Sequence, residues 1–214
     1  FKEETPSLII ASLLIVGLAW DNHLNRIEGG VMLILLFVYL WKTFSKKENT
    51  EVELEEGSHF LRNRGPAVQS FLVIAGLVML VLGANLMVEG ATGVARKMGI
   101  SEWFIGVSIV AVGTSLPEIV SALIAAKRGH GEMAIGNIFG SNIFNILMVL
   151  GLTAIIHPLH INEPIQPDLL ITIAIIGLLL GMIRFGNHSL GKLKGVVLIL
   201  VYCVYIGLKG TGSL

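Results

Sequence analysis

The stretch Gly113-Thr-Ser-Leu-Pro-Glu118 brings together a carboxylate, two hydroxyls, a glycine and a proline. It lies within a long apolar run from Trp103 to Ala126, in which Glu118 is the only acidic residue. A carboxylate at this depth in a membrane span is costly, and such groups normally face a bundle interior or an aqueous path. We therefore interpret Glu118 as the centre of a candidate site.

The backbone around Pro117 is expected to add further oxygen ligands. Pro117 has no N–H and crowds the carbonyl of Gly113, so that oxygen is expected to leave the helical ladder. Broken helices are tolerated in membranes where they line a cavity. Thr114 and Glu118 share a helix face, with Ser115 beside them. This set of oxygens suits a hard cation such as Ca²⁺, which takes about 6–8 oxygen ligands.

The structural alternative is a kinked helix whose carboxylate is neutralised by a nearby base. The nearest basic residues, Lys127 and Arg128, stand at the end of the apolar run. We therefore favour cation binding over an ion pair at Glu118.

A second polar motif, Gly136-Asn-Ile-Phe-Gly-Ser-Asn-Ile-Phe-Asn145, follows in the next apolar run. Asn137, Ser141 and Asn145 recur every four residues and form one polar stripe on a helix. The two glycines are also four residues apart, a spacing that lets helices approach closely. Taken alone, the stripe fits hydrogen bonding between helices as well as ion binding. Beside Glu118 on the adjacent helix, ion binding is the better interpretation.

The composition is that of an integral membrane protein. Hydrophobic residues make up 54% of the 214 residues, charged residues make up 14%, and the mean hydropathy is +0.80. The hydrophobic share and the mean hydropathy lie above ordinary usage in soluble domains, and the charged share lies below it. The 15 basic and 15 acidic residues cancel, so no basic surface indicates nucleic-acid binding. No histidine falls within an apolar run, which disfavours an intramembrane enzyme, and we predict neither enzyme activity nor a cofactor.

Seven apolar runs approach or exceed the roughly 20 residues that a transmembrane helix needs. They lie at about 6–20, 30–44, 67–95, 103–126, 133–156, 168–183 and 192–208. A polar stretch at 45–66 separates the second run from the third and is interpreted as a linker. The expected fold is all-α, with seven transmembrane helices in this chain.

The distribution of basic residues predicts the orientation in the membrane. Successive connections alternate between the two sides, and lysine and arginine are enriched on the cytoplasmic side. One side carries Lys2, Lys42, Lys46, Lys47, Arg62, Arg64, Lys127, Arg128, Arg184, Lys192 and Lys194, whereas the other carries Arg26, Arg96, Lys97 and Lys209. The linker is therefore expected in the cytoplasm and the C-terminus outside.

One of the external connections contains His157 and His160 on either side of Pro158. Zinc sites use three or more protein ligands as a rule, and the sequence shows no third ligand beside this pair. We predict no metal site there.

A weak internal repeat appears at an offset of 166 residues, where Gly29 and Tyr39 match Gly195 and Tyr205. The first two runs then repeat as the sixth and seventh. Because the two copies stand an odd number of spans apart, they cross the membrane in opposite directions. Inverted repeats of this kind are typical of secondary transporters. A complete first copy would hold three more helices, so half of a two-fold site is expected from spans outside this sequence.

The two motifs resemble the second alpha-repeat of the sodium/calcium exchanger family, within the wider cation/calcium antiporter superfamily. Their order on consecutive helices, joined by a short basic connection, is specific to that family. The resemblance extends from about Ser7 to the C-terminus and implies ten helices in two inverted five-helix halves. It implies a prokaryotic-type member in which 1–44 are the last two helices of the first half, 45–66 the cytoplasmic linker and 67–214 the second half.

The resemblance also implies roles for individual residues. The implied ligands of Ca²⁺ and Na⁺ are Glu118, Thr114, Ser115, Ser141, Asn145 and the carbonyl of Ala111. Glu118 would be the central ligand, and Ala111 would serve a flanking Na⁺. Relatives often carry Asp at the position of Asn145, so this half of the site has one negative charge fewer in this chain than in those relatives. The coupling ion and the stoichiometry are left open by that difference.

The expected function is exchange of Ca²⁺ for Na⁺ across the plasma membrane by alternating access. The two kinds of ion compete for the same carboxylates, so binding one set expels the other. A proton is the alternative coupling ion, and a passive cation channel or a structural membrane subunit would also explain polar spans. The predicted partners are Ca²⁺, Na⁺, the lipid bilayer and the three missing helices.

Overall fold

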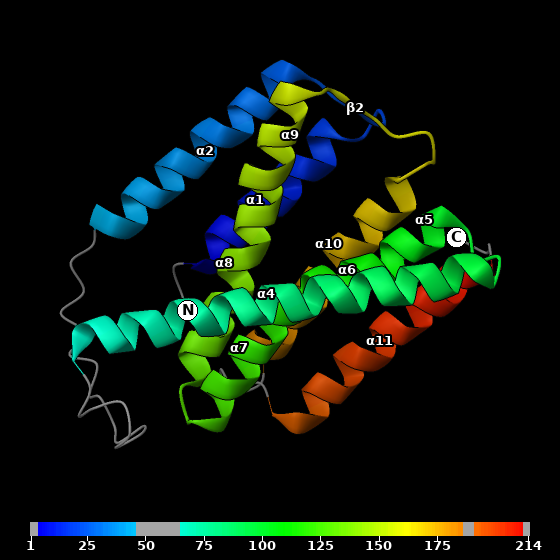
Figure 1. Ribbon diagram of the computed structural model, residues 1–214. Coiled ribbons are helices and arrows are strands. Elements are labelled where there is room, and N and C mark those ends of the chain that lie inside the picture. Colours follow the sequence, from blue (N-terminus) through cyan, green and yellow to red (C-terminus); the bar gives the residue numbers. More distant parts are fainter. Residues whose placement is uncertain (1–3, 46–64, 186–190, 212–214) are drawn as a thin grey trace. The chain divides into compact units, whose positions relative to one another are not determined.

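The structure is a computed structural model that describes residues 4–45, 65–185 and 191–211, most of which are helical (Figure 1). The helices are α1 (Glu4–Leu18), α2 (Arg26–Ser45), α4 (Pro66–Lys97), α5 (Glu102–Ile105), α6 (Ala111–Thr114), α7 (Leu116–Lys127), α8 (Gly131–Phe144), α9 (Gly151–Ile156), α10 (Gln166–Arg184) and α11 (Lys192–Gly210). Two π-helical segments, η1 (Gly106–Val110) and η2 (Asn145–Leu150), interrupt them, and two short strands, β1 (His23–Leu24) and β2 (Leu159–His160), pair antiparallel. Most of the predicted linker lies outside the described residues.

Each of the seven predicted apolar runs is helical. Among the described residues, five helices are long and apolar enough to cross a membrane. They are α2, α4, α10, α11 and the continuous helix Gly131–Ile156, which is made up of α8, η2 and α9. A bent pair, α5 to α6 followed by α7, qualifies as a sixth span when its two parts are counted together. Helix α1 has 15 residues, which is short for a span. The all-α membrane fold is confirmed, with five or six of the seven predicted spans supported by length and composition.

Local chemistry fixes where two of the helices begin. The side chain of Asn25 accepts hydrogen bonds from the backbone N–H groups of Ile27 and Glu28, and Glu28 Oε2 accepts one from the Asn25 N–H at 2.8 Å. This reciprocal capping box starts α2 at Arg26, before the predicted apolar run. Pro66 occupies the first turn of α4, where its missing N–H costs nothing.

The chain divides into two compact units, which we describe separately. The larger unit comprises residues 1–45 and 121–214, and the smaller unit comprises residues 46–120. The predicted boundaries at 44 and 66 separate internal sequence repeats, whereas the two units are separated by their internal contacts. The repeat boundaries therefore stay a prediction.

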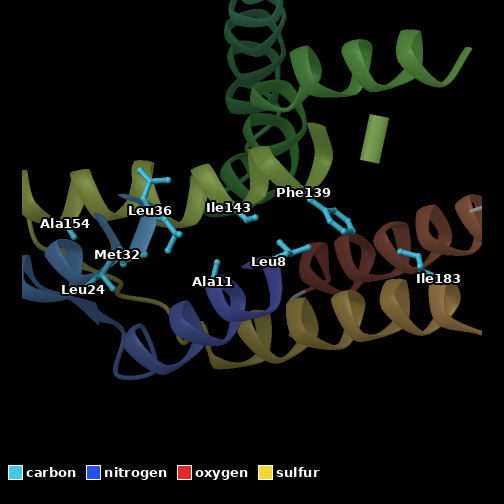
Figure 2. Packing of buried hydrophobic residues seen from close by; sticks show 10 residues of the cluster. Leu8, Ala11, Leu24, Met32, Leu36, Phe139, Ile143, Ala154 and Ile183 are labelled. Atoms are coloured by element: carbon cyan, nitrogen blue, oxygen red, sulfur yellow. The ribbon is translucent and has the colours of Figure 1, made fainter. Parts of the chain in front are cut away.

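The core of the larger unit lies between α1, α2 and the helix from α8 to α9. Figure 2 shows Leu8 and Ala11 of α1 on the side of α1 that faces Phe139 and Ile143 of α8. All four side chains are buried. The hydroxyl of Ser12 is also buried, and it donates to the Leu8 carbonyl at 2.7 Å, so it is satisfied within its own helix. One apolar face of α8 therefore packs against α1.

Helices α2 and α9 approach closely at two glycines, Gly29 and Gly151. A Cβ placed on Gly29 would lie 2.5 Å from the carbonyl oxygen of Gly151 and 3.0 Å from the Cβ of Ala154. The contact is between backbones, so rotation of a side chain cannot relieve it. Small residues at such crossings let membrane helices pack tightly.

Replacing Gly29 by alanine is expected to destabilise the larger unit, because the added methyl group forces α2 away from α9. Overpacking of this kind costs about 1–3 kcal/mol. Thermal unfolding in detergent micelles measures the change. Gly30→Ala is the matched control, because a Cβ on Gly30 meets nothing within 4 Å. Equal unfolding temperatures for the two variants would contradict the close crossing.

Candidate cation-binding site

The helix that carries Glu118 is interrupted inside the first motif. Ser115 separates α6 from α7 and has φ −90° and ψ 0°. Its N–H donates to the Val112 carbonyl at 3.2 Å, which is the tighter i to i−3 pattern of a helix end. Pro117 has no N–H to continue the ladder, which accounts for the 42° bend between the two parts. The expected interruption is present, two residues before the proline.

The predicted ligands of the first motif lie on both sides of this break. The Thr114 hydroxyl donates to the carbonyls of Val110 and Ala111, at 3.0 and 3.2 Å. The Ala111 oxygen, expected to serve a flanking Na⁺, therefore accepts a hydrogen bond in this structure. Glu118 and Ser115 are half-buried, and the Oε2 atom of Glu118 is shielded from solvent. The break thus gathers a carboxylate, two hydroxyls and helix-end carbonyls within two turns.

Both motif-bearing helices contain a π-helical segment that the sequence analysis missed. Segment η1 ends at Val110, directly before α6, and η2 begins at Asn145. The Ser108 hydroxyl in η1 donates to the Phe104 carbonyl one turn earlier. Segments of this kind occur frequently at functional sites, because the wider turn redirects backbone groups. The Ser108 hydrogen bond is visible only in the structure, and the residue types of the two segments do not predict them.

Gly113 sets the approach of α6 to α4 in the smaller unit. A Cβ placed on Gly113 would lie 2.0 Å from Cγ2 of Val88, so no larger residue fits without movement. Gly113 is buried, whereas its neighbour Thr114 is exposed. The glycine of the first motif therefore has a packing role, next to residues with a proposed ligand role.

Replacing Gly113 by alanine is expected to lower the unfolding temperature, because the added methyl group overlaps Val88. The cost of overpacking is about 1–3 kcal/mol. In a double-mutant cycle, Val88→Ala is expected to recover most of the loss, which isolates the contact from other effects. Gly106→Ala serves as the control, since a Cβ there meets nothing within 4 Å. A loss that Val88→Ala leaves unchanged would show that the two residues do not conflict.

The second motif lies on α8 and the start of η2, in the larger unit. Asn137 and Ser141 are half-buried and Asn145 is exposed. The Ser141 hydroxyl donates to the Ile138 carbonyl at 3.1 Å. Asn142 stands off this stripe, as its position predicts, and lines a cavity of about 240 Å³ that α1 and α10 also line.

The polar stripe and the apolar face of α8 point in different directions. Phe139 and Ile143 are 1% and 0% exposed and pack toward α1. Ser141 lies midway between them in sequence, about 200° around the helix from each. The stripe of Asn137, Ser141 and Asn145 therefore lies on the opposite side of α8 from the face that packs on α1. Glu118 belongs to the smaller unit, so its convergence with the stripe stays a prediction.

The described residues hold no group of three or more His, Cys, Asp or Glu side chains that could bind a metal ion together. The residues at the helix break supply one carboxylate together with hydroxyl and carbonyl oxygens. Such a donor set suits Na⁺ or Ca²⁺ better than a transition metal. Further charge for a divalent ion must come from outside this set.

Comparison with known proteins matches residues 68–210 to the sodium/calcium exchanger protein family. The chain belongs to the sodium/calcium exchanger family. The match confirms the expected family. Its members are ion exchangers rather than enzymes, and they are multi-pass membrane proteins.

Individual relatives agree with this assignment. CaxA of Alkalimonas amylolytica is 34% identical over 216 residues, an alignment that covers 95% of this chain and 66% of CaxA. The inner membrane protein YrbG of Escherichia coli is 30% identical over 167 residues, covering 75% of this chain and 51% of YrbG. The solved structure of the sodium-calcium exchanger NCX_Mj matches with a TM-score of 0.67 at 30% identity, covering 95% of this chain and 64% of NCX_Mj. The chain therefore spans between about half and two thirds of the length of these exchanger-family proteins.

Proposed function

We propose that this chain forms the ion-binding second half, and the last two helices of the first half, of an antiporter that exchanges Ca²⁺ for Na⁺. The observation that carries the proposal is the helix break at Ser115 with Glu118 half-buried beside it. In a membrane, a broken helix with a carboxylate is tolerated where it lines an ion path. The description of NCX_Mj as a sodium-calcium exchanger supports this choice of ions.

The proposed ligands come from both motifs. They are Glu118, Thr114 and Ser115 at the break, Ser141 and Asn145 on the stripe, and the carbonyl of Ala111 for a flanking Na⁺. The stripe faces away from the core of its own unit, as a ligand face must. When an ion binds, the Thr114 hydroxyl is expected to turn from the Ala111 carbonyl toward the ion, which frees that carbonyl as well.

Asn145 contributes an amide oxygen where a carboxylate would add charge. Glu118 is then the one full negative charge in this half of the site. The rest of the charge that Ca²⁺ requires is proposed to come from the first alpha-repeat, on helices outside this sequence. With fewer carboxylates, H⁺ is the alternative to Na⁺ as the coupling ion.

The proposed topology follows the repeat boundaries, with residues 1–44 in the first half, 45–66 as a cytoplasmic linker and 67–214 in the second half. The antiparallel pairing of β1 with β2 supports it. These strands belong to the connection after α1 and the connection after α9, which alternation of seven spans places on one side of the membrane. We assign that side, and the C-terminus, to the outside of the plasma membrane, because most of the basic residues fall on the other side.

Exchange follows from competition for one set of oxygens. Ca²⁺ and Na⁺ cannot occupy Glu118 together, so each expels the other. Occupancy by either one permits the change between inward-open and outward-open states, and an empty charged site does not. The bend at Ser115 is the place where the helix can alter its direction during that change.

The test is Ca²⁺ uptake into proteoliposomes. Because the chain spans 66% of CaxA, the assay uses a chimera in which the unmatched part of CaxA completes the chain. The chain alone serves as the half-site control. Uptake driven by an opposed Na⁺ gradient in the chimera, but not in the chain alone, is the expected result.

The other outcomes are equally informative. Uptake driven only by an opposed H⁺ gradient would assign the coupling to protons. Uptake that ignores both gradients would indicate a passive channel and contradict the proposal. Full exchange by the chain alone would contradict the proposal that this chain carries only half of the ion site.

A further inference from the structure

Two histidines distant in sequence lie side by side on the short strand pair of the larger unit. The antiparallel register places His23 of β1 opposite His160 of β2. Their ring centroids are 3.8 Å apart and the rings are perpendicular. His160 is exposed and His23 is half-buried, so water reaches the pair. In the sequence His160 stands close to His157, where no metal site is predicted, whereas in the structure its ring contacts His23.

Hydrogen bonds outside the strand pair also fix the backbone that carries the two histidines. Beyond the strand pair, the Ile161 N–H donates to the Asn22 carbonyl at 2.9 Å. The Gln166 amide donates to the Trp20 carbonyl at 2.7 Å. Asn22 has φ 62°, in the left-handed region that Asn tolerates better than most residues. These contacts join the connection after α1 to the connection after α9, so the register of the histidines is preorganised.

We propose that His23 and His160 form a two-imidazole site for a borderline divalent transition ion such as Zn²⁺. Residues opposite one another in an antiparallel pair have Cβ atoms about 4.5–5.5 Å apart. Rotation about the side-chain torsions can then bring one nitrogen of each ring to the roughly 2.0–2.1 Å that a Zn–N bond requires. Imidazole nitrogen selects Zn²⁺, Ni²⁺ or Cu²⁺ over Ca²⁺. The site is therefore chemically separate from the oxygen site around Glu118.

The pair supplies two protein ligands where typical zinc sites supply three or more, so water completes the coordination and the ion is expected to bind more weakly than at a typical zinc site. Among the described residues, no three His, Cys, Asp or Glu side chains converge. Asp21 stands two residues before His23, and its Oδ1 accepts the backbone N–H of His23 at 3.0 Å. His157 stands apart, with its Nδ1 3.0 Å from the carbonyl oxygen of its neighbour Pro158. A bound ion would cross-link the two connections and resist their separation.

The experiment is calorimetric titration of the purified full chain with ZnCl₂ in metal-free buffer. One equivalent of Zn²⁺ is expected to bind, and excess Ca²⁺ is not expected to displace it. His160→Ala is the main variant, because His160 is exposed and its loss leaves the fold intact. It is expected to abolish binding, and His23→Ala to do the same. His157→Ala is the matched control and should bind like the parent.

A second readout separates binding from folding. Zn²⁺ is expected to raise the unfolding temperature of the parent and of His157→Ala, but not of His160→Ala, because only a ligand that binds the folded state stabilises it. Without Zn²⁺, the parent and His160→Ala should unfold at the same temperature. Failure of the parent to bind Zn²⁺, or binding that persists in both His23→Ala and His160→Ala, would overturn the proposal.

Discussion

Glu118→Gln is expected to abolish gradient-driven Ca²⁺ uptake by the chimera with CaxA. Glutamine keeps the size and one carbonyl oxygen of glutamate but removes the only full negative charge among the proposed ligands in this chain. Removing one partner of a buried charge pair costs about 3–5 kcal/mol. Since about 1.4 kcal/mol is tenfold in affinity, Ca²⁺ transport should fall by at least about 100-fold.

The control is Glu132→Gln, which removes the same charge from an exposed residue at the start of α8. It should transport like the parent. Unfolding temperatures of both variants check that Glu118→Gln is folded. Uptake by folded Glu118→Gln at the parent's rate would show that Glu118 is not an ion ligand.

Residue type and spacing were sufficient to predict the helices and the break. Most of the apolar runs are long, and some have local signals at their ends, such as the capping box at Asn25 and the proline at the start of α4. The break at Ser115 follows from the missing N–H of Pro117, which is a property of one residue. Features that depend on one residue or on its near neighbours can be read from a single sequence.

Contacts between distant segments could not be predicted in this way. Gly29 was noted only as a match to Gly195 in the internal repeat. In the structure Gly29 is also required by packing, because a Cβ there would collide with the backbone of Gly151. A Cβ on Gly195 would meet nothing within 4 Å among the described residues. The neighbour of a helix depends on how all the helices pack, and apolar residues of similar size do not specify it.

The candidate site is predictable to the same extent. Spacing places Ser141 with Asn145 on one stripe, and the buried Phe139 lies on the other side of α8. Thr114 and Glu118, which spacing alone would put on one helix face, lie on either side of the break at Ser115. The hydrogen bond from Thr114 to Ala111 and the π-helical segments have no comparable sequence signal. They arise from how each helix accommodates its neighbours.

Lys209→Met is expected to weaken the packing of α11 against α10. Lys209 Nζ lies 2.9 Å from Oδ2 of Asp168, with side chains 5% and 19% exposed. The Tyr205 hydroxyl donates to Oδ1 of Asp168 at 3.0 Å. Loss of the lysine leaves a largely buried carboxylate without its counter-charge, at a cost of about 3–5 kcal/mol. Tyr205→Phe removes one hydrogen bond and should cost about 1 kcal/mol.

Thermal unfolding in detergent micelles distinguishes loss of the ion pair from loss of a lysine in general. Lys192→Met, at the exposed opposite end of α11, should change the unfolding temperature little. Adding Asp168→Asn to Lys209→Met should recover much of the stability, because the pair is then removed as a unit and no buried charge remains. If the double variant is no more stable than Lys209→Met, packing of the lysine stem rather than its charge holds α11 against α10.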